Sequence, residues 1–244
     1  MDTRERHENI DFCIRYLLAQ NEAQAELPGK LGDKKQLLRA LMNIWEPQPH
    51  SDEFLAAQDA ELQAQLEEKG VVATRDRLWQ GDITRLKVDA IVNAANSRGL
   101  GCWHPLHACI DNAIHSAAGL QLRQECNKIL HGNEIATGSA IITPAYNLPS
   151  RFVIHTVGPV IGTDAPTAGE EELLAACYRT CLYLAEEQGC RSIAFCCIST
   201  GEFRFPNRRA AEIAVRFCRD AHIRVIFNVF KDIDYDIYRN LLGV

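Results

Sequence analysis

The pattern of hydrophobic and polar positions changes near residue 70. Before that point, apolar residues recur at the spacing of amphipathic helices, as Ile10, Ile14 and Leu17 do. Capping residues and a proline-rich break mark where such helices begin and end. The pattern predicts helices over residues 9–23, 33–44 and 51–70, the last two capped by Asp33 and Ser51. We expect residues 1–70 to form a helical extension packed against the main domain.

From residue 71 onward, short apolar runs alternate with helical patterns. Strands are expected over residues 78–80, 90–93, 139–143, 152–156, 192–198 and 225–229, and helices over residues 107–118, 120–130, 170–187, 207–220 and 235–242. The continuous apolar run SIAFCCI at 192–198 predicts a strand buried on both faces. Residues 71–244 therefore predict a layered α/β domain, in which ligands bind where strands lead into helices.

The composition and charge of the chain argue against several classes of function. A net charge of −6 without a basic stripe argues against a nucleic-acid partner, although backbone N–H groups can still hold a small phosphorylated ligand. No apolar run is long enough to span a bilayer, and the opening MDTRERHENI lacks the apolar core of a secretory signal. We expect a cytoplasmic protein whose ten cysteines are buried thiols or metal ligands rather than disulfides.

The connection after the strand at 90–93 carries a possible metal motif, C-x4-H-x-C. Cys102, His107 and Cys109 offer two thiolates and one imidazole, a set that suits zinc. Three protein ligands leave a fourth position open, as in catalytic zinc sites. His104 is an alternative to His107, and the residues could instead be loop residues without a metal. Asp111 follows, where it could orient water or a substrate hydroxyl or simply cap a helix.

Two further connections are suited to a phosphorylated nucleotide. Gly201 in the stretch Ser199–Phe203 lets backbone N–H groups turn toward an anion ahead of a helix N-terminus, and Phe203 could wall a sugar. The stretch matches neither a P-loop nor a dinucleotide fingerprint. Asp82, in a turn after the strand at 78–80, could accept a hydrogen bond from a base. Without further information, Phe230 is interpreted as a core residue.

Taken together, these stretches resemble the macrodomain family. The matching segments are QGDIT at 80–84, DAIVNAAN at 89–96, GCWHPLHACIDNAIHSAAG at 101–119, TGSAIITPAYNLP at 137–149, FVIHTVGP at 152–159 and STGEFRFP at 199–206. The glycine run that ordinary hydrolytic macrodomains carry after NAAN is replaced by GCWHPLH, which resembles the zinc-dependent branch. The resemblance implies a three-layer α/β/α sandwich on a mixed six-stranded sheet that binds ADP-ribose.

The resemblance also implies roles for single residues. Asn96 and Asp111 match the catalytic positions, and Cys102, His107 and Cys109 match the ligands of one zinc ion. Asp82 matches the residue that holds the adenine amine, Phe230 the aromatic that stacks on adenine, and Phe203 the aromatic against the distal ribose. The implied ADP-ribose-binding set is Asp82, Ile83, Asn96, Ser199, Thr200, Gly201, Glu202, Phe203 and Phe230.

The function implied is zinc-dependent hydrolysis of mono-ADP-ribose from modified proteins. Zinc could activate water or anchor the ribose diol, and the sequence leaves that choice open. The alternatives are a reader that binds ADP-ribose without cleaving it, a deacetylase acting on O-acetyl-ADP-ribose, and a purely structural zinc. The branch is similar to proteins that act with a sirtuin-like transferase on a lipoyl-carrier protein. We expect a monomer.

Overall fold

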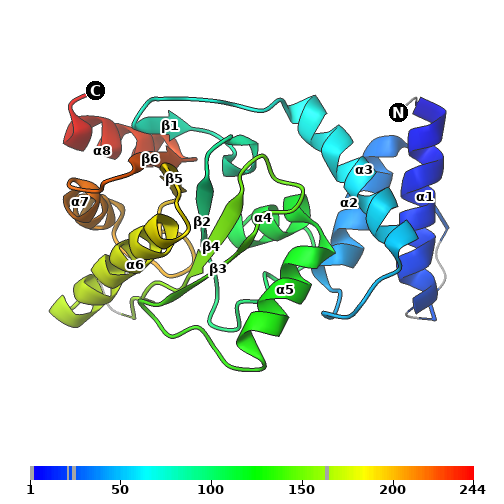
Figure 1. The fold of residues 1–244 in the computed structure, drawn as a ribbon, viewed down its shortest axis with the longest axis horizontal. Coiled ribbons are helices and arrows are strands. Elements are labelled where there is room, and N and C mark those ends of the chain that lie inside the picture. Colours follow the sequence, from blue (N-terminus) through cyan, green and yellow to red (C-terminus); the bar gives the residue numbers. More distant parts are fainter. Residues whose placement is uncertain (1–2, 21, 24–25, 163–164) are drawn as a thin grey trace.

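The structure is a computed structural model that describes residues 3–20, 22–23, 26–162 and 165–244. Three helices come first, α1 (Thr3–Gln20), α2 (Leu31–Asn43) and α3 (Asp52–Lys69). They share a hydrophobic cluster that includes Ile10, Leu17, Leu38 and Phe54. Figure 1 shows them as a group of helices outside the sheet, which accounts for the separate hydrophobic pattern of this part of the sequence.

A six-stranded mixed sheet forms the centre of the remaining chain. Its strands are β1 (Leu78–Gln80), β2 (Ala90–Ala94), β3 (Ala140–Pro144), β4 (Phe152–Thr156), β5 (Ser192–Phe195) and β6 (Arg224–Val229). Their order is β1-β6-β5-β2-β4-β3, and only the pair β3–β4 is antiparallel. Every residue of β5 is buried, as the apolar run SIAFCCI predicted.

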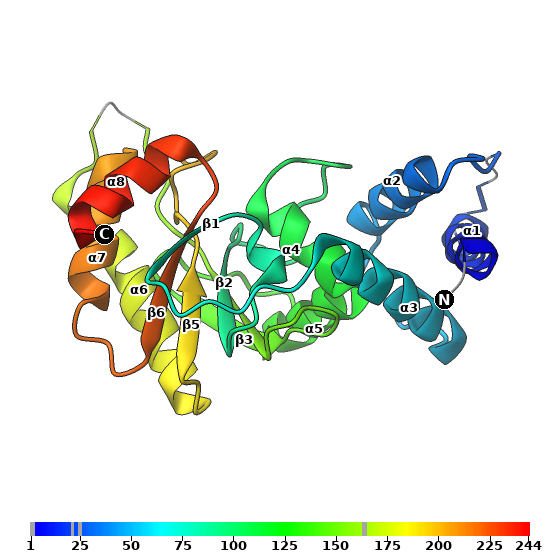
Figure 2. The same ribbon diagram turned by 90° about the horizontal axis from the view of Figure 1, so that it is seen from above.

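Helices cover both faces of the sheet. On one face lie α4 (Ile110–Ala118) and α5 (Leu120–Leu130), and on the other α6 (Ala168–Glu187), α7 (Asn207–Cys218) and α8 (Asp232–Leu242). Figure 2 shows α4 and α5 lying between the sheet and the N-terminal helices. The predicted three-layer sandwich with an N-terminal group of helices is therefore confirmed. None of the helices in the described ranges is long and apolar enough to cross a membrane.

Several predicted boundaries were wrong, and three of them are informative: the start of α1, the end of β5 and the start of α4. Helix α1 begins at Thr3, not at residue 9, because the charged residue Arg6 is buried and pairs with Glu61 of α3 at 2.9 Å. The helix ends at Gln20, and residue 21 of the predicted range lies outside the described residues. Strand β5 ends at Phe195, because the chain turns where Ile198 N donates to Cys196 O at 3.0 Å.

The third boundary concerns the metal motif. Helix α4 begins at Ile110 and not at residue 107, because the thiol of Cys109 caps it and accepts a hydrogen bond from Asn112 N at 3.4 Å. His107 consequently lies in the loop before the helix. This places the whole motif between the end of β2 and the first turn of α4.

Candidate active site and metal centre

A cleft of about 1100 Å³ lies at the carboxyl edge of the parallel strands. Strand β2 leads toward α4 on one face of the sheet, whereas β5 leads toward α7 on the other. Loops that leave neighbouring strands toward opposite faces open a crevice between them. Apart from the alternative ligand His104, the site residues singled out in the sequence all line this cleft: Asp82, Ile83, Asn96, Cys102, His107, Cys109, Asp111, Ser199, Thr200, Gly201, Glu202, Phe203 and Phe230.

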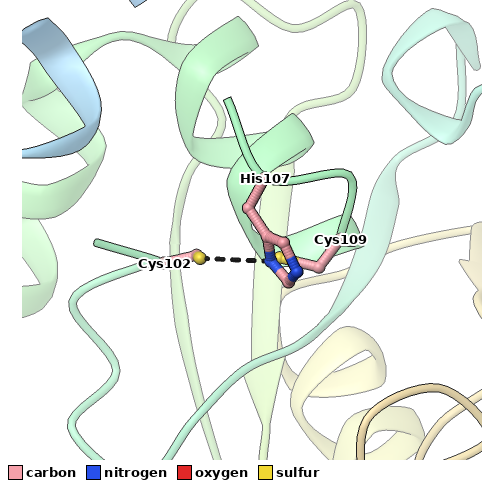
Figure 3. A group of neighbouring side chains, drawn as sticks. All are labelled: Cys102, His107 and Cys109. Carbon is pink, nitrogen blue, oxygen red and sulfur yellow. Dashed lines mark hydrogen bonds between the residues drawn. The ribbon is translucent and has the colours of Figure 1, made fainter. Parts of the chain in front are cut away.

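The three candidate metal ligands lie together, as Figure 3 shows, and all three line the cleft. Their ligand atoms lie within 4.8 Å of one another, and Cys102 Sγ is 3.5 Å from His107 Nδ1. Ligand atoms of a tetrahedral zinc site are separated by about 3.5–3.8 Å when zinc–ligand bonds have their usual lengths. The donor set and its spacing therefore fit zinc, with His107 Nδ1 as the imidazole ligand atom and all three side chains only half-buried.

His104 does not join this group. Its backbone carbonyl accepts a hydrogen bond from Asn112 Nδ2 at 3.0 Å, and its ring meets the ring of His107 edge-on at 5.4 Å. Within the described residues the thiols are thus brought together with His107 and not with His104. The other nitrogen of the metal-facing imidazole, His107 Nε2, lies 4.0 Å from Glu202 Oε1. A carboxylate on this side is the usual companion of a metal-bound histidine.

The carboxylate of Asp111 lies beside the metal ligands at the start of α4. It is buried and accepts hydrogen bonds from Asn93 Nδ2 at 2.7 Å and from Asn96 Nδ2 at 3.1 Å. Burial raises the pKa of the Asp111 carboxyl to about 6, and the bonds from Asn93 and Asn96 and the charge of Arg123 reduce that rise. Burial likewise raises the pKa of the neighbouring Cys109 thiol to about 12.

Two buried histidines, His155 and His115, lie next to the hydrogen bonds between Asn93, Asn96 and Asp111. His155 accepts from Asn93 Nδ2 at 3.2 Å through Nδ1 and lies 3.1 Å from Thr143 Oγ1 through Nε2. His115 packs 5.6 Å from it, and burial lowers the pKa of both imidazoles, that of His155 to about 3. Both rings are therefore neutral and lie buried beneath the cleft residues.

The loop after β5 is held in an unusual backbone conformation. Ser199 has φ +65°, and its hydroxyl oxygen is buried without a hydrogen-bond partner among the described residues. A strained residue at a cleft is frequently functional. Phe203 packs against a small cluster with Leu130, Ile135 and Val157, and its carbonyl accepts from Ile161 N at 2.8 Å. The loop is consequently anchored at Phe203 while Thr200 and Gly201 face the cleft.

Asp82 and Phe230 lie on the side of the cleft formed by the turn after β1 and the end of β6. The Asp82 side chain caps a short 3-10 helix (Ile83–Arg85) and lies 3.4 Å from Lys69 Nζ. Burial tends to raise the pKa of Asp82, but bonds from Thr84 and the charge of Lys69 offset this and lower it. Phe230 is 75% exposed, so its interpretation as a core residue was wrong.

One wall of the cleft was missed by the sequence analysis. Helices α2 and α3 contribute Lys35, Gln36, Arg39, Leu62, Gln65, Leu66 and Lys69 to the lining. No motif distinguishes these residues, because their place at the cleft results from docking of the N-terminal helices on α4 and α5. All ten cysteines lie in the described part of the chain and are free thiols.

Comparisons with known proteins agree with this architecture. Residues 92–214 match the Macro domain family. The chain is 47% identical over 254 residues to a Treponema medium protein named protein-ADP-ribose hydrolase, covering 95% of this chain and 97% of that protein. It is similar to the Oceanobacillus iheyensis macrodomain with ADP, with TM-score 0.60 and 40% identity over 68% of this chain and 88% of that one.

A Trypanosoma brucei macrodomain in complex with ADP-ribose is also similar. Its TM-score is 0.62 at 30% identity, and the match covers 84% of this chain and 95% of that one. The fold is an α/β/α sandwich with a cleft at the carboxyl edge of its sheet. The chain belongs to the macrodomain family.

Proposed function

We propose that this protein is a zinc-dependent hydrolase that removes mono-ADP-ribose from modified proteins. The observation that carries the proposal is the cluster of Cys102, His107 and Cys109 on the wall of a nucleotide-sized cleft, next to the buried Asp111. A relative with 47% identity over nearly the whole chain is named protein-ADP-ribose hydrolase. Structures similar to this one hold ADP or ADP-ribose.

Zinc bound to the two thiolates and Nδ1 of His107 would supply a Lewis acid with one open coordination position. Among the described residues, no fourth His, Cys, Asp or Glu atom lies within 4.8 Å of all three ligand atoms, which favours a catalytic over a structural ion. The scissile bond joins the distal ribose to a protein side chain and breaks through an oxocarbenium-like state. In this proposal the distal ribose would lie between the metal ligands and Asp111.

Asp111 and Asn96 position the reacting groups in this proposal. The Asn96 amide donates to Asp111 Oδ2 and to Gly101 O, both at 3.1 Å, and so joins the NAAN loop to the metal loop. A carboxylate fixed in this way can accept a hydrogen bond from water or from a ribose hydroxyl. Phe203 would cover the distal ribose and exclude bulk water, which strengthens the electrostatic interactions inside the cleft.

The rest of the cleft binds the nucleotide. The backbone N–H groups of the loop from Ser199 to Glu202 and the N-terminus of α7 would hold the diphosphate. The carboxylate of Asp82 would accept a hydrogen bond from the adenine amine, and Ile83 would lie beside the base. The exposed ring of Phe230 would stack on the base. These assignments use every candidate residue that lines the cleft.

Release of ADP-ribose from defined substrates tests the proposal. Proteins carrying mono-ADP-ribose on Ser, Asp, Glu or Arg, and a lipoyl-carrier protein modified by a sirtuin-like transferase, would be incubated with the purified protein. We expect release from at least one linkage. Binding of ADP-ribose without release from any linkage would instead identify a reader. Cleavage restricted to O-acetyl-ADP-ribose, with acetate as product, would identify a deacetylase.

A further inference from the structure

The loop that carries the metal ligands is held by a helix about seventy residues earlier in the chain. Arg39 of α2 donates from Nε and Nη2 to Asn112 Oδ1, at 3.1 and 2.7 Å. Its Nη2 also lies 3.3 Å from the backbone carbonyl of His107, which accepts a hydrogen bond. One guanidinium therefore ties a candidate metal ligand and the first turn of α4 to the N-terminal helices.

Asn112 makes further hydrogen bonds to the loop that carries the metal ligands. Its side chain is fully buried, and its Nδ2 donates to His104 O while its backbone N donates to Cys109 Sγ. Arg39 occupies the amide oxygen and so fixes which way the amide faces. Asn112 therefore contacts the loop on both sides of His107, through its side chain at His104 and through its backbone N at Cys109, and its side chain is itself oriented by α2.

Asn43, one turn further along α2, makes a second attachment. Its Oδ1 accepts from Leu106 N at 2.9 Å, and its Nδ2 donates to Ser116 Oγ at 2.9 Å. Leu106 has φ +57°, a left-handed conformation that a leucine adopts at a cost of about 1 kcal/mol or more. The bond from Asn43 stabilises this turn, which aims the next residue, His107, at the two thiols.

The other end of the loop is attached through Arg123 of α5. Its Nη1 donates to Trp45 O at 2.6 Å, beyond the end of α2, while its Nε donates to Leu100 O at 2.7 Å. Its guanidinium also stacks 4.2 Å from the ring centroid of Trp103. Trp103 follows Cys102 directly, so both halves of the metal motif are supported by the region around α2.

We infer that α2 is the support of the metal loop, and that Arg39 and Asn43 are positioning residues for His107. The inference rests on the proposed function, since it assumes that the cluster binds zinc. Metal ligands that are already held in place lose little conformational entropy when the ion binds. Zinc binding is therefore stronger than it would be to a flexible loop. Mutation of residues that orient metal ligands typically weakens metal binding by about 10- to 100-fold.

The test compares zinc affinities of full-length variants by competition with a chromophoric chelator, with cobalt substitution as a spectroscopic measure of ligand geometry. Arg39→Ala removes the attachment, Arg39→Met keeps the aliphatic stem in case the alanine variant misfolds, and Arg39→Lys restores one donor. Gln63→Ala is the matched control. Gln63 of α3 donates to Asn147 O at 3.0 Å and so also joins the N-terminal helices to the rest, away from the metal loop.

We expect Arg39→Ala and Arg39→Met to weaken zinc binding by about 10-fold or more, with altered cobalt spectra and partial recovery in Arg39→Lys. Gln63→Ala should bind zinc as the wild type does. Equal zinc affinity in the wild type and both Arg39 variants would overturn the inference while leaving the proposed function standing. A wild-type protein that binds no zinc would refute the proposed function, and the inference with it.

Discussion

Asn96 Nδ2 lies 3.1 Å from Asp111 Oδ2, and this hydrogen bond joins the end of β2 to the start of α4. It brings the second asparagine of NAAN and the acidic residue after the metal motif to one point of the cleft. Neither side chain is needed to build the sheet, since the strands are held by backbone bonds and apolar burial. Their contact lies at the point of the cleft where we propose that the reacting groups are positioned.

Asp111→Asn should abolish most of the hydrolysis while sparing nucleotide binding. The amide has almost the same shape but cannot accept a proton, so we expect turnover to fall by about 100-fold or more. Zinc content and the affinity for ADP-ribose, measured by calorimetry, should stay close to those of the wild type. Turnover within a few-fold of the wild type would remove Asp111 from the catalytic role.

Phe230→Ala should weaken ADP-ribose binding without destabilising the fold. The ring is 75% exposed, so its loss costs little core packing, but stacking on a base is worth about 1–3 kcal/mol. We expect the Kd to rise by about 10-fold at an unchanged melting temperature. Tyr183→Ala on α6, which is also exposed but lies outside the cleft lining, is the control. Equal effects of the two substitutions would contradict base stacking.

Gly158→Ala should disturb the diphosphate loop. A methyl group at Gly158 would lie 2.0 Å from Ser199 Oγ and 2.8 Å from Ile198 Cγ2, so the side chains of both loop residues must shift to admit it. Losing one charge-assisted hydrogen bond to phosphate would raise the Kd of ADP-ribose by roughly 10-fold. Gly169→Ala, whose nearest neighbour would be Thr167 Oγ1 at 3.9 Å, serves as control. An unchanged Kd would mean that the loop does not depend on this close packing.

Stability should fall as the pH drops below about 6.5, because His155 is buried as a neutral ring. Its pKa is lowered to about 3, so the unfolded state binds a proton that the native state refuses between these values. This amounts to about 2 kcal/mol of lost stability at pH 5. A positive charge on the His155 ring would also be opposed by the amide of Asn93, which donates a hydrogen bond to that ring. The titratable groups that face His155 are His115 and Cys126.

Denaturant unfolding between pH 7 and pH 5 measures this effect. The free energy of unfolding of the wild type should fall over this range. The slope of this free energy against pH gives the number of protons taken up on unfolding, and we expect His155→Gln to lower that number by close to one. His115, also neutral and buried, adds to the slope in both proteins and so cancels in the comparison. Parallel slopes for the two proteins would show that His155 is protonated in the native state.

Much of the fold could be predicted from the sequence, because buried strands such as β5 are continuous apolar runs between turn residues. Cys102, His107 and Cys109 were found because their spacing fits a single loop. Arg39 and Asn43 could not be found, since their contacts depend on docking of helices seventy residues away. The sequence prediction that Phe230 is a core residue was wrong, because the sequence does not show which aromatic at a strand end faces solvent.

The most direct test of the account is whether hydrolysis depends on zinc bound by this cluster. Release of ADP-ribose from a mono-ADP-ribosylated protein would be followed before and after treatment with a strong zinc chelator, with zinc content measured on the same samples. We predict that release stops when the metal is removed, returns when zinc is added back, and is absent in Cys102→Ala. Undiminished release from metal-free protein or from Cys102→Ala would contradict the zinc-dependent mechanism.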